Sequence, residues 1–279
     1  MKTPFFSIIT INFNNHKGLE KTIKSAVAQG YTNYEFIIID GGSTDEFNEV
    51  ISRYEKNISY WCSQKDKGIY DAQNKGIQQA KGEYLVFMNS GDAFSSNDVL
   101  EKASSIIASD NNKHQIFYGN TNLVEIDGSI RLLMPPKDLT LNFFYFETIN
   151  HQACFIKRSL FDTFGLYDLS YKLCADFDFF LKVFFSNHET YRYINEIICD
   201  YENYGVSSSA IHFDLMIKER EDICKKILND EQLDKFKRLD IKLLGRKSKV
   251  FNLVPKSEPL RNFYDKFYYQ WYKHRTGKH

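Results

Sequence analysis

Polar side chains able to bind a phosphorylated ligand follow three of the apolar runs in the first hundred residues. Asn12 lies at the end of the first run, Asp40 ends the second, and Asp92 closes the turn after a later one. Carboxylate and amide groups can hydrogen-bond a planar base or a ribose, and carboxylate oxygens also bind the hard cations that accompany phosphates. These residue types therefore suit a nucleotide site, provided that the fold brings the three turns together.

The elements around these residues alternate between two hydrophobic periods. Short apolar, β-branched runs predict buried strands, and Leu19, Ile23 and Val27 share one face of a predicted helix. The predicted strands are 5–13, 34–40, 58–63 and 83–90, and the predicted helices are 16–29, 45–54 and 69–80. This alternation indicates a mostly parallel sheet covered on both faces, in which ligands bind beyond the carboxyl ends of the strands.

The three polar turns occupy those strand ends, and each is predicted to open a helix, where free N–H groups favour phosphate. Gly41 and Gly42 would let the backbone approach a ligand closely. Asp40 or Ser43 could equally cap the following helix, and both roles can hold at once.

The middle of the chain is less regular. Residues 114–135 predict a β-hairpin with Asp127-Gly128 at its turn, residues 150–165 a strand and a short helix, and residues 176–186 another helix. From about Phe213 the pattern becomes helical and charged, then basic and aromatic.

Segment 65–92 is the most specific signal in the sequence. It reads KDKGIYDAQNKGIQQAKGEYLVFMNSGD and resembles the family 2 glycosyltransferases of the GT-A fold, inverting enzymes of the kind that build bacterial polysaccharides. The matching positions are Gly68, Ala72, Asn74, Gly76, Ile77, Ala80, Gly82, Glu83, Tyr84 and Asp92. Further matches at Thr10, Asn12, 40–45 and Asp176 extend the resemblance over roughly residues 5–210.

This resemblance implies an α/β fold with a GT-A-like, mostly parallel central sheet flanked by helices, and the helical pattern beyond it adds a small helical C-terminal extension. We expect a glycosyltransferase domain over 1–212, with the donor-binding part at about 1–100 and the acceptor-binding part at about 101–212, and the extension over 213–279. The implied donor is a nucleoside-diphosphate sugar, with UDP as the expected nucleotide. Its expected contacts are Thr10, Asn12, Asp40, Gly42, Ser43, Asp66, Asn74, Lys75, Ser90, Gly91 and Asp92, although Lys75 could simply be solvated.

The resemblance also implies a divalent cation, Mg²⁺ or Mn²⁺, which would neutralise the diphosphate leaving group. Asp92 is the expected protein ligand. The family usually has Asp-x-Asp here, whereas this turn reads Asn89-Ser90-Gly91-Asp92 and keeps one carboxylate. One can suffice, since magnesium often keeps water and phosphate ligands. The alternative is that the turn only caps a helix.

An inverting transferase needs a general base that removes the proton of the acceptor hydroxyl. By resemblance this base is Asp176, with Asp178, His151 and Tyr201 expected near the acceptor or the diphosphate. Asp176 could instead be a helix cap and Asp178 an ordinary first-turn acid. Tyr201 opens segment 201–208, which looks like the flexible loop that closes over the sugar-phosphate in this family.

Charge is unevenly distributed along a chain whose formal net charge is zero. Segment 242–279 has ten Lys or Arg against two acidic residues, which gives it about +8 and leaves about −8 for the remainder. Interleaved aromatic residues favour peripheral contact with an anionic membrane, where lipid-linked acceptors reside, while a helix packed on the main domain is the alternative. Nucleic acid is not the expected partner.

The sequence also predicts the cellular location and the state of the cysteines. No apolar run is long enough to span a bilayer and no signal-peptide pattern opens the chain, so we expect a cytoplasmic protein, either free or at the inner face of the cytoplasmic membrane. The five cysteines are widely spaced and predicted to be free thiols.

Two other functions can be compared with the sequence. A nucleotidyltransferase would need a Gly-rich, basic loop after the first strand, which NFNNHKG is not. A non-catalytic carbohydrate-binding or assembly subunit that keeps the fold is distinguished by whether Asp92 and Asp176 face one cleft.

Overall fold

A computed structural model describes residues 3–125, 127–202 and 213–234 of the chain. The chain forms two compact units, 1–227 and 228–279, and all the elements discussed below lie in the first. Helix α8 (Phe213–Ile227) belongs to that first unit, whereas the sequence analysis placed it in the C-terminal extension. Residues 242–279 and segment 203–208 lie outside the described residues, so the predictions made for them stay predictions.

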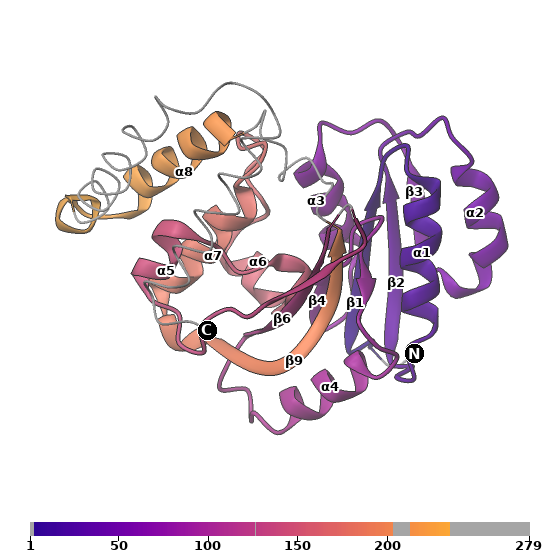
Figure 1. Cartoon of the computed structure of the whole chain (residues 1–279), viewed down its shortest axis with the longest axis horizontal. Helices are drawn as coiled ribbons and strands as arrows, with labels where there is room; N and C mark the ends of the chain where they lie inside the picture. Colours follow the sequence, from indigo (N-terminus) through magenta and orange to yellow (C-terminus); the bar gives the residue numbers. More distant parts are fainter. Residues whose placement is uncertain (1–2, 126, 203–212, 235–279) are drawn as a thin grey trace. The chain divides into compact units, whose positions relative to one another are not determined.

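One sheet of nine strands forms the centre of the first unit (Figure 1), in the order β3-β2-β1-β4-β8-β6-β9-β5, with β7 paired to β6. The strands are β1 (Phe6–Asn12), β2 (Tyr34–Asp40), β3 (Tyr60–Ser63), β4 (Tyr84–Phe87), β5 (Ala93–Phe94), β6 (Ile116–Val124), β7 (Ile130–Leu133), β8 (Cys154–Lys157) and β9 (Tyr191–Glu202). The first four strands are parallel, as predicted, so their carboxyl ends share one edge. Beyond β4 the sheet is mixed, because β8 runs antiparallel to both of its neighbours.

Helices cover both faces of this sheet (Figure 1), which confirms the predicted α/β class. They are α1 (His16–Val27), α2 (Phe47–Tyr54), α3 (Ile69–Gln79), α4 (Val99–Ala108), α5 (Leu141–Phe146), α6 (Ser159–Phe164), α7 (Ala175–Ser186) and α8, with 3-10 turns η1 (Glu55–Asn57), η2 (His151–Ala153) and η3 (His188–Thr190). Among the described residues no helix is long and apolar enough to cross a membrane.

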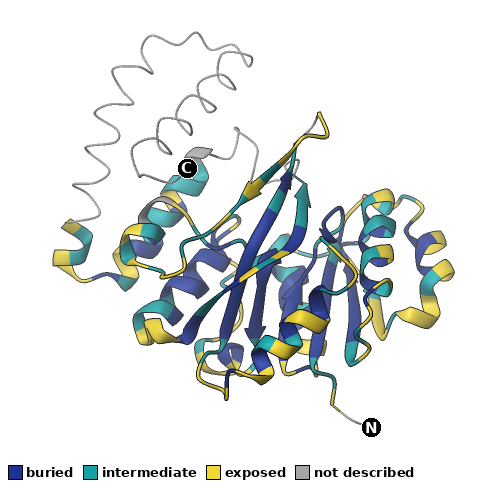
Figure 2. Ribbon diagram, turned by 60° about the horizontal axis from the view of Figure 1, so that its bottom comes forward, coloured by how far each residue is buried: buried dark blue, intermediate teal, exposed yellow. Residues whose placement is uncertain are grey.

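The buried core lies between the sheet and these helices, where Figure 2 shows the central strands in dark blue. Leu19 and Ile23 of α1 pack in one cluster with Phe6 and Ile8 of β1. On the other face, α3 approaches β1 so closely that a Cβ at Gly76 would lie 2.4 Å from a methyl of Ile9. That approach explains the glycine in the middle of α3, where it would otherwise cost helix stability.

Several local predictions are confirmed, and others are wrong. The hairpin over 114–135 forms as β6 and β7, and all five cysteines are free. Strand β9 and helix α4 were not predicted at all. The turn at 89–92 was predicted to open a helix, but β5 follows it and α4 begins only at Val99. Tyr201 was predicted to open a flexible loop, but it lies in β9 opposite Leu123, since the Cys199–Glu202 end of that strand completes the pairing with β6.

Candidate functional site

The carboxylate of Asp40 organises the turn at the end of β2. One oxygen accepts hydrogen bonds from Asn12 Nδ2 at 2.7 Å and Ser43 Oγ at 2.5 Å. The other accepts from Ser63 Oγ at 2.6 Å and from the N–H groups of Ser43 and Gly42 at 2.8 and 3.1 Å. Burial alone raises the pKa of Asp40, but these bonds outweigh it and hold the pKa below its usual range. Asp40 therefore joins the ends of three strands, and in this arrangement its acceptor positions are filled from within the protein.

Asp66 lies directly against this turn. A Cβ at Gly41 would stand 2.6 Å from Asp66 Oδ2, and Gly42 has a φ of +87°, which favours glycine. The ring of Phe13 touches the same position and is 65% exposed. Phe13 was not among the predicted site residues, because the apolar run 5–13 was predicted to be strand to its last residue, whereas β1 ends at Asn12. Together these groups form an open polar and aromatic surface where β1, β2 and β3 end.

Two residues predicted to bind the donor, Thr10 and Asn74, form hydrogen bonds within the protein instead. Thr10 is fully buried and donates to the carbonyl of Met88 at 2.7 Å, which ties β1 to the end of β4. The amide of Asn74 bonds both backbone groups of Tyr167, at 2.8 and 2.9 Å, and so joins α3 to the segment after α6. The structure thus gives both side chains a role in holding elements together.

Lys75, Asp178 and Tyr201 also have neighbours of their own. Lys75 pairs with Asp71 at 3.4 Å on α3. Asp178 is 4% exposed and pairs with Lys182 at 2.6 Å; burial raises its pKa and the lysine opposes that rise. Successive helical residues point about 100° apart, so Asp178 leaves α7 on a different side from Asp176. Tyr201 packs against the hydrophobic core. That Asp178 and Tyr201 lie near the acceptor or the diphosphate stays a prediction.

The carboxylate of Asp92 is buried at the end of the turn after β4. It is 4% exposed, accepts a hydrogen bond from Gln152 Nε2 at 3.2 Å, and accepts another from the N–H of Glu202 at 3.3 Å. Burial raises the pKa of Asp92 to about 7, and the two hydrogen bonds only partly oppose this. A nearby positive charge would favour the ionised form.

The surroundings of Asp92 fit a hard cation. Gly91 has a φ of +107°, and a Cβ there would lie 2.9 Å from Glu202 Oε2, so a second carboxylate reaches this turn. Two buried side-chain oxygens, Asn89 Oδ1 and Ser90 Oγ, have no hydrogen-bond partner. In the described part of the chain no group of three or more His, Cys, Asp or Glu side chains could hold a metal, so a cation would depend on phosphate and water for its other ligands.

Glu202 was missed by the sequence analysis because β9, the strand that carries it, was not predicted. Its Oε1 pairs with Lys21 Nζ on α1 at 2.6 Å. The pair is partly exposed, with 40% and 31% of the two side chains accessible. Glu202 therefore pairs with Lys21 through one oxygen, while its other oxygen lies beside Gly91.

Asp176 lies in the first turn of α7 with its carboxylate held on both sides. Its Oδ1 accepts from the hydroxyl of Tyr70 at 2.8 Å and from the N–H of Phe177 at 2.9 Å, and its Oδ2 lies 3.1 Å from His151 Nδ1. Burial by itself raises the pKa of Asp176, but the bonds from His151 and Tyr70 prevail and lower it. Asp176 is therefore ionised at neutral pH and able to accept a proton.

The imidazole of His151 connects this carboxylate to the turn after β4. Its Nδ1 faces Asp176, while its Nε2 lies 3.3 Å from the amide nitrogen of Asn89 and 3.5 Å from that of Gln73. A ring that donates from Nδ1 to the carboxylate leaves Nε2 as an acceptor toward these amides. The side chains of His151 and Asp176 keep 15% and 12% of their surface exposed, so solvent reaches both.

The 3-10 turn η2 brings the two predicted functional carboxylates together. The side chain of Asn150 caps this turn by accepting from the N–H of Gln152 at 3.1 Å. Within the turn, His151 faces Asp176 and its neighbour Gln152 bonds Asp92. Asp92 and Asp176 are distant in sequence, but each is bonded by one of two consecutive side chains, so η2 links the two carboxylates.

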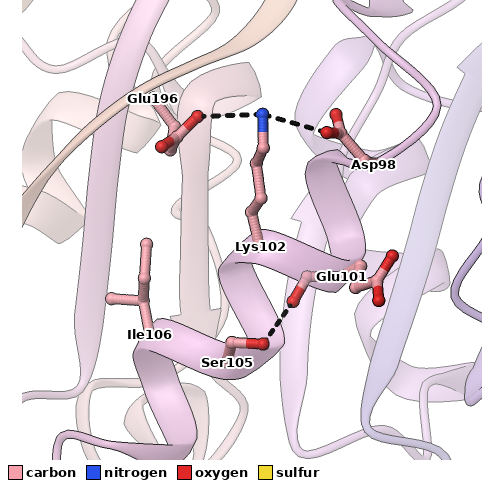
Figure 3. Close-up of a pocket in the computed structure, with 6 residues that line it drawn as sticks. All are labelled: Asp98, Glu101, Lys102, Ser105, Ile106 and Glu196. Atoms are coloured by element: carbon pink, nitrogen blue, oxygen red, sulfur yellow. Dashed lines mark hydrogen bonds and ion pairs between the residues drawn. The ribbon is translucent and has the colours of Figure 1, made fainter.

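A surface hollow elsewhere on the molecule contains none of these residues (Figure 3). There Lys102 of α4 reaches Asp98 at 3.0 Å and Glu196 of β9 at 3.4 Å. Glu101, Ser105 and Ile106 complete its lining. Solvated ion pairs of α4 line this hollow, and it does not include Asp40, Asp92 or Asp176.

Comparison with known proteins supports the sequence resemblance. The family model described as glycosyl transferase family 2 matches residues 7–167. An uncharacterized glycosyltransferase of Mycobacterium tuberculosis is 35% identical over 220 residues, covering 76% of this chain and 82% of that protein. A PGL/p-HBAD biosynthesis glycosyltransferase of Mycobacterium bovis is 29% identical over 218 residues, with the same coverage.

Solved structures share the fold. TarS of S. aureus (residues 1–349), in complex with UDP-GlcNAc, has a TM-score of 0.64 at 17% identity, covering 83% of this chain and 70% of that one. The mannosyltransferase PcManGT of Pyrobaculum calidifontis, in complex with GDP-Man and Mn²⁺, has a TM-score of 0.57 at 15% identity, covering 94% and 84%. The fold is therefore GT-A-like, and the chain belongs to glycosyl transferase family 2.

Proposed function

We propose that this glycosyltransferase moves a sugar, with inversion, from a UDP-sugar to a hydroxyl of a saccharide or lipid-linked saccharide in the assembly of cell-surface polysaccharide or glycolipid. The observation that carries the proposal is the shared turn η2, which contacts Asp176 through His151 and Asp92 through Gln152. The UDP-GlcNAc complex of TarS supports the choice of donor, and the PGL/p-HBAD biosynthesis named for the Mycobacterium bovis relative supports a biosynthetic role.

The donor would lie along the edge where the parallel strands end. The nucleotide would meet the exposed ring of Phe13 and the carboxylate of Asp66, which lie against the turn of Gly41 and Gly42. Its diphosphate would then extend along the edge toward Asp92, since β4 neighbours β1 in the sheet. This order leaves the sugar between the turn after β4 and α7.

Asp176 would act as the general base. Ionised, and held by Tyr70 and His151, it would take the proton of the acceptor hydroxyl while that oxygen attacks the anomeric carbon and the bond to the diphosphate breaks. The burial of Tyr70 and its contact with Asp176 raise the pKa of the phenol well above its usual value, so Tyr70 remains a hydrogen-bond donor. A positioned base of this kind contributes about 10²–10⁴-fold in rate.

Asp92 and Glu202 would hold Mg²⁺ or Mn²⁺. A bound divalent cation supplies positive charge that stabilises the departing diphosphate. PcManGT, which shares the fold, is in complex with GDP-Man and Mn²⁺, and this supports the proposed cation.

Segment 242–279 would bind the inner face of the cytoplasmic membrane through its basic and aromatic residues. The test is co-sedimentation with vesicles rich in anionic lipid, in which deletion of the residues after Arg246 should abolish binding. Unchanged binding by the truncated chain would exclude this role.

The proposed function is tested first with a panel of nucleotide sugars. Thermal stabilisation is measured for the purified chain with each donor, with and without Mn²⁺ or Mg²⁺, since a specific ligand stabilises the folded state. We expect a UDP-sugar to stabilise most, and only with the cation, and Asp92→Ala to lose that effect. Thermal stabilisation that is the same for every nucleotide sugar, with or without the cation, would contradict the proposal and favour a non-catalytic subunit.

A further inference from the structure

Helix α8 holds the segment that leads into α7. The carboxylate of Glu219 accepts three backbone hydrogen bonds, from the N–H groups of Lys172 at 2.7 Å, Leu173 at 2.9 Å and Cys174 at 3.1 Å. Glu219 is 7% exposed, so water cannot readily replace these bonds. Cys174 is the N-cap of α7, and Asp176 follows two residues later. The position of the general base is thus fixed by a side chain from another helix.

Arg220, the next residue of α8, contacts the segment between α5 and η2. The guanidinium of Arg220 donates to the carbonyls of Phe144 at 2.7 Å and Glu147 at 3.0 Å. It also stacks on the ring of Phe177, 4.1 Å from its centroid, immediately beside Asp176. The segment that it holds leads from the end of α5 into Asn150 and η2.

We propose that Glu219 and Arg220 are positioning residues that set the distance between Asp176 and His151. Glu219 fixes the first turn of α7, Arg220 fixes the approach to η2, and both reach across from a helix beyond the family-matched residues 7–167. Neither side chain contacts the edge of the sheet where the nucleotide is proposed to bind. The proposal rests on the function proposed above, because it assigns their effect to the placement of the base.

A positioning role makes a specific kinetic prediction. A shift of about 1 Å in a reacting group can cost about 10²-fold in rate without weakening ligand binding. Glu219→Ala and Arg220→Met should therefore lower kcat by about 10- to 100-fold and leave the affinity for UDP unchanged. Glu219→Gln keeps one acceptor oxygen and should lose less.

The experiment measures hydrolysis of the UDP-sugar found in the panel, with water in place of the acceptor, and binding of UDP by calorimetry. The full chain is used, well below the melting temperature of each variant. Glu221→Gln is the matched control, since Glu221 lies on the same helix in an exposed pair with Lys225 and should change neither quantity. If Glu219→Ala does not fold, Glu219→Gln and Arg220→Met carry the test.

A second arm separates placement of the base from general stabilisation. In the Asp176→Asn background the base is already absent, so Glu219→Gln should cause no further loss of residual hydrolysis. Folded Glu219 and Arg220 variants that keep the kcat of the control would overturn the proposal. So would a double variant, Asp176→Asn with Glu219→Gln, whose loss of kcat equals the product of the two single losses. Full hydrolysis by Asp176→Asn alone would instead overturn the proposed function, so the two failures are distinguishable.

Discussion

The hydroxyl of Tyr70 offers a direct probe of the charge on Asp176. Tyr70→Phe removes a bond of 2.8 Å to the carboxylate of Asp176, a buried residue, while the ring can keep its contact with Tyr167 at 5.4 Å. A hydrogen bond to a charged, buried group contributes about 1.5–3 kcal/mol, against about 0.5–1.5 kcal/mol for a neutral one. We therefore expect a loss of about 1.5–3 kcal/mol in the free energy of unfolding at pH 7.

The sign of the pH dependence follows from the lowered pKa of Asp176. A carboxylate whose pKa is lower in the folded state stabilises the fold above its unfolded pKa, and that contribution disappears as pH falls through its folded pKa. Tyr70→Phe raises the folded pKa, so both acid unfolding and the acid limb of the rate should move to higher pH. Acid unfolding followed from about pH 5 to below the ordinary Asp pKa of 3.8, together with the pH–rate profile for UDP-sugar hydrolysis, measures both shifts, and urea unfolding at pH 7 measures the loss of stability. A loss below about 1 kcal/mol with an unmoved acid limb would refute an ionised, functional Asp176.

Three further substitutions test other parts of the site. Glu202→Gln should weaken Mn²⁺ binding in the presence of UDP by about tenfold, as measured by electron paramagnetic resonance. The control Glu196→Gln, on the same strand, should bind Mn²⁺ like the wild type. If Glu202→Gln also binds Mn²⁺ like the wild type, Glu202 is not a cation ligand. Gly91→Ala should cost about 1–3 kcal/mol in urea unfolding, because it strains the backbone and meets Glu202, and wild-type stability would contradict the geometry. Asn74→Ala should lower the melting temperature through two lost bonds to Tyr167 yet leave UDP affinity unchanged, and weaker UDP binding would restore its predicted donor contact.

The parallel part of the fold could be predicted from the sequence because each element there is marked locally. Runs such as YEFIIID are apolar and β-branched, and the polar residue that ends each one reports the strand end directly. Asp40 and Asp92 follow from that pattern alone, and Asp176 from the family resemblance. The structure then joins Asp92 and Asp176 through η2, a contact that no sequence period encodes.

The rest of the site depends on contacts between distant residues. Strand β9 contains Asn195 and Glu196 in its middle and a bulge against β6, which hides its alternation. Glu202 therefore could not be placed beside Gly91. The i,i+4 spacing of Asp178 and Lys182 was visible and could have indicated an ion pair on α7.

The central claim is that Asp92 and Asp176 act in one site as cation ligand and base, and the hydrolysis rate of Asp176→Asn tests it most directly. At saturating UDP-sugar and Mn²⁺, we expect kcat to fall by about 10²–10⁴-fold while UDP affinity stays within about twofold of the wild type. Unchanged UDP affinity also shows that the variant is folded. A variant that binds UDP normally and hydrolyses the donor at the wild-type rate would contradict the account.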